Sequence, residues 1–159
     1  MDILRFFLYP FSFIWWGLSI LRNNLFDSGI LKSTSFNLPV IGIGNLSVGG
    51  TGKTPMTAYV AELLIEKKYK VSILSRGYKR ETSGFISADE TTNSRAIGDE
   101  PFQLFKQLPQ AKVFVCEDRV KGIEKILEQS PETDVIVLDD CYQHRKLQAG
   151  LYILLSDYN

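Results

Sequence analysis

The 159-residue sequence contains little cysteine and no excess of either charge. Its two cysteines, Cys116 and Cys141, are too few for a disulfide framework and lack the spacing of metal ligands, which favours a reducing compartment. Eighteen basic residues balance eighteen acidic ones, whereas proteins that coat nucleic acids usually carry a basic excess, so we expect no nucleic-acid partner. Hydrophobic residues make up 45% of the chain and charged residues 23%, which predicts a folded globular protein rather than general disorder.

Charge is absent from one long apolar run, residues 6–21, which is flanked by Arg5 and Arg22. The run is shorter than the roughly 20 residues that a membrane-spanning helix normally needs, and it contains Pro10. The residues after it make a poor cleavage site, which argues against a secretory signal. Three interpretations are left for this run: a helix or bent hairpin in the membrane interface, a buried core helix, or a true membrane span.

Aromatic and basic residues favour the interfacial interpretation. Tyr9, Trp15 and Trp16 suit the boundary between lipid headgroups and acyl chains, and the two flanking arginines can reach anionic phosphates. We therefore treat residues 1–32 as a membrane-associated segment and residues 33–159 as a separate folded domain.

Short apolar runs alternate with amphipathic helical patterns along the rest of the chain. Strands are predicted at residues 40–44, 71–74, 113–116, 135–138 and 151–155. Helical faces are predicted from the spacing of Met56, Tyr59, Val60, Leu63 and Leu64, of Pro101, Leu104, Phe105 and Leu108, and of Val120, Ile123, Ile126 and Leu127. Residues 79–97 are polar and are expected to form a long loop, with a hairpin around Phe85 and Ile86. This alternation predicts an α/β fold with a parallel sheet flanked by helices.

The clearest chemical signal is Ser-Val-Gly-Gly-Thr-Gly-Lys-Thr at residues 47–54. It lies between a predicted strand and a predicted helix at residues 54–68, which is the setting that a P-loop requires. Glycines let backbone N–H groups surround phosphate oxygens, and the helix N-terminus favours anions. We expect Lys53 to reach the β- and γ-phosphates of ATP and the Thr54 hydroxyl to bind Mg²⁺, unless this is a glycine-rich turn without a ligand. The residues expected to bind nucleotide are Ser47, Val48, Gly49, Gly50, Thr51, Gly52, Lys53 and Thr54.

Two carboxylates, Asp139 and Asp140, follow the apolar strand at residues 135–138. This is the Walker B arrangement, in which a buried strand delivers a carboxylate to Mg²⁺. Adjacent residues at the end of a strand point to opposite faces, so we expect the two carboxylates to have different partners. One can hold the metal shell while the other faces the phosphate acceptor; a pair of turn-forming aspartates is the alternative.

Several nucleotide-binding classes are excluded by motifs that the sequence lacks. The guanine-specificity pattern Asn-Lys-x-Asp is missing, and so is the Leu-Ser-Gly-Gly-Gln signature of ABC ATPases. Membrane-partitioning ATPases carry a lysine just before the double glycine, where this chain has Val48. An ATP-using P-loop kinase or a nucleotide-switched membrane protein is left.

Four ordered motifs separate these two classes: Gly44–Pro55, Leu74–Tyr78, Gly98–Pro101 and Asp139–Arg145. Together they resemble the tetraacyldisaccharide 4'-kinase (lipid A 4'-kinase) family over nearly the whole chain. The resemblance implies an enzyme that uses ATP and Mg²⁺ to phosphorylate the 4'-hydroxyl of a tetraacylated glucosamine disaccharide 1-phosphate. It also implies a monotopic enzyme on the cytoplasmic face of the bacterial inner membrane. Members of the family are longer and have a second α/β domain, so we expect this chain to be the first part of a longer protein.

The resemblance also implies roles for single residues. It makes Asp139 the partner of the Mg²⁺ shell and Asp140 the base for the sugar hydroxyl, with Asp99 near the transfer site as the alternative base. His144, the single histidine, is expected at the catalytic edge of the sheet, or else in a hydrogen-bonded turn. Asp99 can also serve simply as a helix N-cap. The chain departs from the family pattern at Cys141 and Lys79, where the family has glycine.

The sequence offers two interpretations for Arg76 and one for Arg119. Arg76 follows a predicted strand and either contacts phosphate or is a solvated side chain. Arg119 follows Glu117 and Asp118 and is interpreted only as the start of a helix.

Overall fold

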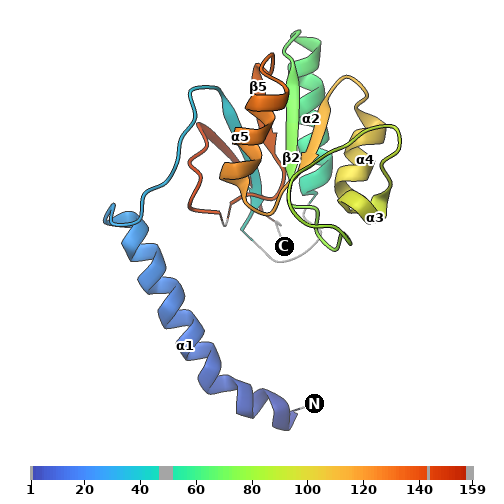
Figure 1. The fold of residues 1–159 in the computed structure, drawn as a ribbon. Coiled ribbons are helices and arrows are strands. Elements are labelled where there is room, and N and C mark those ends of the chain that lie inside the picture. Colours follow the sequence, from blue (N-terminus) through green and yellow to red (C-terminus); the bar gives the residue numbers. More distant parts are fainter. Residues whose placement is uncertain (1, 47–51, 143, 157–159) are drawn as a thin grey trace. The chain divides into compact units, whose positions relative to one another are not determined.

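The computed structural model describes residues 2–46, 52–142 and 144–156, and it separates into two compact units, Met1–Ser33 and Thr34–Asn159 (Figure 1). The first unit consists mainly of one helix, α1 (Asp2–Asp27). The helix continues through Pro10, so a bent hairpin is the wrong interpretation of this segment.

The apolar side chains of α1 for which exposure is described are largely exposed, including Phe13, Trp16 and Leu18. The side chains of Arg5, Tyr9 and Trp15, on which the interfacial interpretation also depends, lie outside the described part of the structure. Within the described residues, no helix combines the length and the apolar character required to cross a bilayer.

The second unit is built on a six-stranded sheet with the order β3-β4-β2-β5-β1-β6. All neighbouring strands are parallel except β3 and β4, which are antiparallel. The strands are β1 (Val40–Asn45), β2 (Val71–Ser75), β3 (Ile86–Ser87), β4 (Lys112–Val115), β5 (Val135–Leu138) and β6 (Leu151–Leu155). The predicted α/β fold with a mostly parallel sheet is confirmed.

Helices cover both faces of this sheet (Figure 1). Side chains of α2 (Lys53–Glu66) and α4 (Asp99–Gln107) share one core cluster with Ile73 of β2, while α5 (Arg119–Gln129) shares the other cluster with Leu74. Successive residues of a strand point to opposite faces, so Ile73 and Leu74 enter different clusters and each side of the sheet is buried. Such a sheet brings the carboxyl ends of its parallel strands to one edge.

The buried face of α2 differs from the one that the apolar spacing predicts. Tyr59 and Leu63 are exposed, whereas Thr57, Ala58 and Ala61 are buried together with Val60. Small side chains let the helix backbone come close to the sheet, and this arrangement brings the Thr57 hydroxyl to the end of β5. The predicted helical face was based on large apolar residues, so it included the exposed Tyr59 and Leu63 and omitted the small residues that are buried.

The segment at residues 79–97 contains more regular structure than a loop. Its strand β3 pairs with β4 through Ile86 and Val115, so the local hairpin predicted around Phe85 is wrong. A short helix, α3 (Ser94–Ile97), follows and is capped by the side chain of Asn93. Lys79 has a φ of 60°, which is a left-handed conformation that glycine adopts more easily.

Candidate functional site

The start of α2 lies at the carboxyl edge of the sheet, directly after the phosphate-loop sequence. Gly52 precedes the helix with a left-handed φ of 80°, and its carbonyl accepts the backbone N–H of Met56 at 3.0 Å. Lys53 and Thr54 therefore occupy the first turn of the helix, where N–H groups favour an anion. Ser47, Val48, Gly49, Gly50 and Thr51, also expected to bind nucleotide, lie outside the described residues.

Lys53 of the phosphate-loop sequence and Asp140 of the acidic pair lie close together, although they are far apart in the chain. The Lys53 ammonium nitrogen is 3.9 Å from Oδ1 of Asp140, which follows β5. The Asp140 side chain is 57% exposed, so a second molecule can reach its carboxylate. Its backbone is left-handed, with a φ of 50°, which turns the chain sharply after Asp139.

Asp139 has the opposite environment. It is almost completely buried, and its two carboxylate oxygens accept hydrogen bonds from the hydroxyls of Thr57 (2.9 Å) and Ser75 (3.2 Å). Burial raises the pKa of Asp139, and these two hydrogen bonds act against the rise. The two carboxylates thus have different partners, as strand alternation predicts, while their catalytic roles stay predictions.

The turn that carries the carboxylates packs over β1. The backbone N–H of Cys141 donates to the carbonyl of Ile43 at 3.0 Å. A side chain at Gly44 would meet Cβ of Tyr142 at 2.4 Å, and one at Gly42 would meet Sγ of Cys141 at 2.7 Å. Glycines in β1 therefore allow this close approach. Cys141 is buried, which raises the pKa of its thiol to about 12, and the left-handed residue here is Asp140 rather than Cys141.

Helix α4 supplies two acidic residues. Asp99 is the first residue of the helix and Gly98 occupies the cap position, so the N-cap interpretation of Asp99 is wrong. Both Asp99 and Glu100 lie in the first turn, where the helix dipole stabilises negatively charged side chains. Desolvation raises the pKa of Glu100, and the charges of Asp139 and Asp140 raise it further. The charges of the two aspartates therefore act on Glu100, which belongs to the motif at residues 98–101, where the resemblance implies a role only for Asp99.

Arg119 is more than the start of a helix. Its side chain is among the largest that are fully buried, and its guanidinium donates to the carbonyl of Cys116 at 2.6 Å and to that of Asp140 at 3.5 Å. The N-cap of α5 is Asp118, which accepts from two backbone N–H groups of the helix. Arg119 thus stabilises the turn that carries the two carboxylates through the carbonyl of Asp140. No sequence motif indicated this role.

The structure gives less information about the roles of Arg76 and His144. Arg76 is exposed directly after β2. His144 is half-buried in a turn, where its backbone N–H donates to the carbonyl of Cys141 at 2.9 Å. Both lie in loops that follow strands at the carboxyl edge, and their proposed roles stay predictions.

Oxygen ligands near the start of α2 fit a hard cation such as Mg²⁺. Mg²⁺ usually binds through one or two carboxylates, phosphate oxygens and water, rather than through a cage of protein ligands. The described residues contain no cluster of three or more His, Cys, Asp or Glu side chains that could hold a metal alone. The hydroxyl of Thr54 and the carboxylate of Asp139 have the appropriate chemistry.

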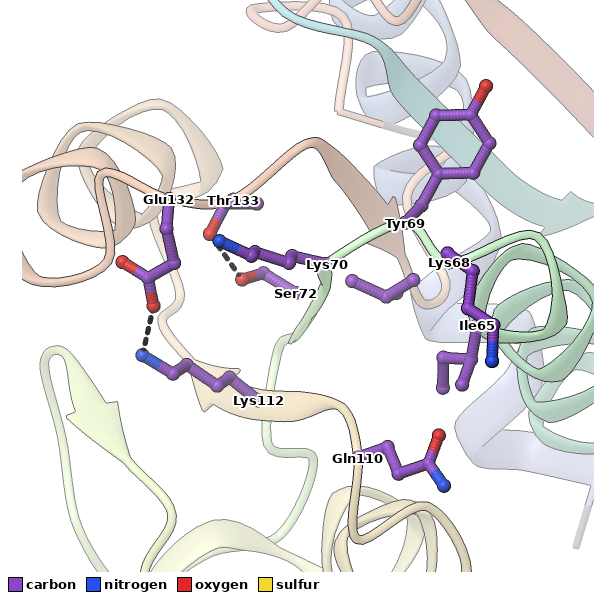
Figure 2. Close-up of a pocket in the computed structure, with 10 residues that line it drawn as sticks. Ile65, Lys68, Tyr69, Lys70, Ser72, Gln110, Lys112, Glu132 and Thr133 are labelled. Atoms are coloured by element: carbon purple, nitrogen blue, oxygen red, sulfur yellow. Dashed lines mark hydrogen bonds and ion pairs between the residues drawn. The ribbon is translucent and has the colours of Figure 1, made fainter.

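A pocket of about 280 Å³ lies at the opposite, amino-terminal edge of the sheet (Figure 2). Its lining includes Lys70, Ser72 and Lys112, and Lys112 donates to Glu132 and to Ser130. Among the residues that the structure describes, none of those predicted to bind nucleotide, metal or acceptor lines this pocket.

Strand β1, the lysine-bearing start of α2 and the acidic end of β5 define an α/β domain of the P-loop NTPase type. A family model described as tetraacyldisaccharide-1-P 4'-kinase (LpxK) matches residues 4–159. The chain belongs to this family.

Individual relatives agree with this assignment. A tetraacyldisaccharide 4'-kinase from Flavobacterium johnsoniae is 53% identical over 159 residues, which cover 100% of this chain and 46% of that protein. Another from Bacteroides fragilis is 51% identical over 153 residues, covering 96% and 40%. A crystal structure of LpxK from Aquifex aeolicus in complex with ATP has a TM-score of 0.84 and 44% identity, covering 95% of this chain and 48% of that one. This chain thus spans about half the length of the relatives that it matches.

Proposed function

We propose that the complete protein is a kinase that transfers the γ-phosphate of ATP to the 4'-hydroxyl of a tetraacyldisaccharide 1-phosphate. The observation that best supports this is the approach of Lys53 to Asp140 at the start of α2. It joins the lysine of the phosphate loop to the acidic end of β5, as a phosphoryl-transfer site requires. The names of the relatives, and the ATP complex of the Aquifex aeolicus structure, support the same pair of substrates.

In this proposal, residues 47–54 hold the phosphates of ATP and Lys53 neutralises their charge. Thr54 and Asp139 hold Mg²⁺, which neutralises charge on the β- and γ-phosphates when it is bound. Asp139 is buried and cannot reach an acceptor, so it is suited to this role.

The exposed Asp140 is suited to proton transfer. The 4'-oxygen of the acceptor forms a bond to the γ-phosphorus, and the bond from that phosphorus to the β–γ bridging oxygen breaks. ADP leaves, and the proton of the acceptor hydroxyl passes to Asp140. Asp99 is the alternative base, and His144 is proposed to contribute from the turn after β5.

Nucleotide binding can be tested by thermal unfolding. Mg-ATP should raise the melting temperature of the wild-type protein, because a ligand that binds only the folded state stabilises it. Lys53→Ala should remove most of this gain. Equal shifts in both proteins would show that this loop does not hold the phosphates.

The proton-transfer role is tested by comparing Asp140→Asn with Asp99→Asn in the complete protein. A general base usually contributes about 10²–10⁴-fold, so Asp140→Asn should lower kcat by about that factor while apparent Mg-ATP affinity is kept. A nearly normal kcat for Asp140→Asn, with a large loss in Asp99→Asn, would assign the proton to Asp99.

A non-catalytic, nucleotide-dependent membrane switch is the second candidate, because the exposed apolar side chains of α1 favour a membrane interface. A kinase consumes ATP in step with phosphorylation of the lipid acceptor. A switch binds or hydrolyses ATP without the acceptor, so ATP turnover with and without acceptor separates the two.

The membrane location is likewise proposed. An acylated acceptor stays in the bilayer, so the enzyme must work at its surface. We place the protein at the cytoplasmic face of the bacterial inner membrane, attached through residues 1–32, with residues 33–159 as the kinase domain.

A further inference from the structure

Thr57 connects Asp139 to the phosphate-loop end of α2. Its hydroxyl lies 2.9 Å from Oδ1 of Asp139 and 3.0 Å from the carbonyl of Lys53, and it is fully buried. A hydroxyl has one proton to donate, and a bond to a carboxylate is stronger than one to a neutral carbonyl. The proton of Thr57 therefore goes to Asp139 when that carboxylate is ionised.

Ser75 contacts the other oxygen of the same carboxylate from β2. Its hydroxyl donates to Oδ2 of Asp139 at 3.2 Å and lies 3.5 Å from the backbone N–H of Gly77. Ser75 is also buried, with 3% of its surface exposed. The serine hydroxyl thus joins Asp139 to the turn that follows β2.

Each oxygen of Asp139 has one hydroxyl donor, and the two donors come from different elements. This arrangement fixes the plane of the carboxylate through two neutral hydroxyl donors. It also replaces part of the hydration that a buried carboxylate loses. No motif described above includes Thr57, and Ser75 occurs in one only as an unassigned residue.

We propose that Thr57 and Ser75 are positioning residues, whose hydroxyls hold the Asp139 carboxylate in the orientation in which it binds Mg-ATP. This inference rests on the proposed role of Asp139 in the metal shell. Groups that orient a metal ligand typically change metal affinity by about 10–100-fold when they are removed.

The test measures the Mg²⁺ concentration that gives half of the ATP-induced rise in melting temperature, using the full chain. Thr57→Val and Ser75→Ala should each raise this concentration by about 10–100-fold. Thr57→Ser keeps the hydroxyl and should restore the wild-type value. A second readout is kinetic: the two variants should raise the Mg²⁺ requirement of turnover more than they lower kcat at saturating Mg²⁺.

Ser72 provides a matched control on the same strand. Like Ser75 it is a buried serine of β2, but its hydroxyl lies 2.8 Å from that of Thr133, beside the pocket at the opposite edge of the sheet (Figure 2). Ser72→Ala removes a buried serine hydroxyl without touching Asp139. It should therefore leave the Mg²⁺ requirement unchanged, even if it lowers the melting temperature.

Asp139→Asn, measured in parallel, separates the two levels of the argument. If it raises the Mg²⁺ requirement while Thr57→Val and Ser75→Ala do not, the positioning role is wrong and the proposed function stands. If Asp139→Asn itself keeps the wild-type requirement, the role of Asp139 in the metal shell is wrong and the inference falls with it. Should Thr57→Val fail to fold, Ser75→Ala against Ser72→Ala decides the question alone.

Discussion

Gly44→Ala should displace the turn after β5, which carries Asp139 and Asp140. An added Cβ at this position of β1 would lie 2.4 Å from Cβ of Tyr142 and 3.3 Å from its backbone nitrogen. Carbon atoms normally approach to about 3.5–4.0 Å, so the atoms would overlap by about 1.1–1.6 Å. Because the atoms of Tyr142 involved are backbone or Cβ atoms, no side-chain rotation relieves it. The turn that carries Asp140 must shift instead.

The size of the effect follows from this overlap. Overpacking of a well-packed region typically costs about 1–3 kcal/mol, and each kcal/mol lowers the melting temperature by about 2–4 °C in a domain of this size. Asp140 lies two residues before Tyr142 and 3.9 Å from Lys53, so the shift also changes the site. A misplacement of about 1 Å can lower the rate by about 10²-fold.

Thermal unfolding followed by circular dichroism, together with an acceptor phosphorylation assay of the complete protein, measures both effects. Gly150→Ala is the matched control, because its added Cβ would have only an ordinary contact, 3.7 Å from the carbonyl oxygen of Val40. Gly44→Ala should lose both stability and turnover, whereas the control should keep them. Wild-type melting and wild-type turnover in Gly44→Ala would refute the packing argument.

Three further changes test other parts of the molecule. Lys79→Gly should raise the free energy of unfolding in urea by roughly 0.5–1 kcal/mol. The φ of Lys79 is 60°, and a left-handed backbone costs a non-glycine residue about 1–2 kcal/mol, which the larger conformational entropy of unfolded glycine partly offsets. Lys79→Ala keeps the strained conformation and should not stabilise the fold. Burial raises the pKa of Asp139 above its usual 3.8, so the contribution of Asp139 to stability decreases as pH rises from the unfolded pKa through the higher folded pKa. In urea unfolding between about pH 4 and pH 7, the Asp139→Asn variant should therefore lose less stability than the wild-type protein. Equal losses in the two proteins would contradict this. Membrane attachment through apolar side chains should survive high salt but not detergent, and deletion of residues 1–24 should abolish it; extraction by salt alone would rule out apolar anchoring.

The sequence alone was sufficient for the class of fold and for the position of the phosphate-binding helix. Apolar runs separated by amphipathic patterns determine strands and helices locally, so β1, β2, β4, β5 and β6 lie where they were predicted within a residue or two. The lysine of the glycine-rich stretch lies in the first turn of α2 for the same reason. Residues 47–51 and the catalytic roles of Asp99, Asp140 and His144 stay predictions.

Tertiary structure decided which side chains surround the predicted ones. Thr57 and Ser75 are 82 and 64 positions away from Asp139 in the chain, and they meet its carboxylate only because α2 and β2 pack beside the end of β5. Buried Arg119 reaches the carbonyl of Asp140 for the same reason. Local periodicity describes one element at a time and cannot predict such contacts. They depend on which face of α2 small residues allow to approach the sheet, and on the order in which the strands pair.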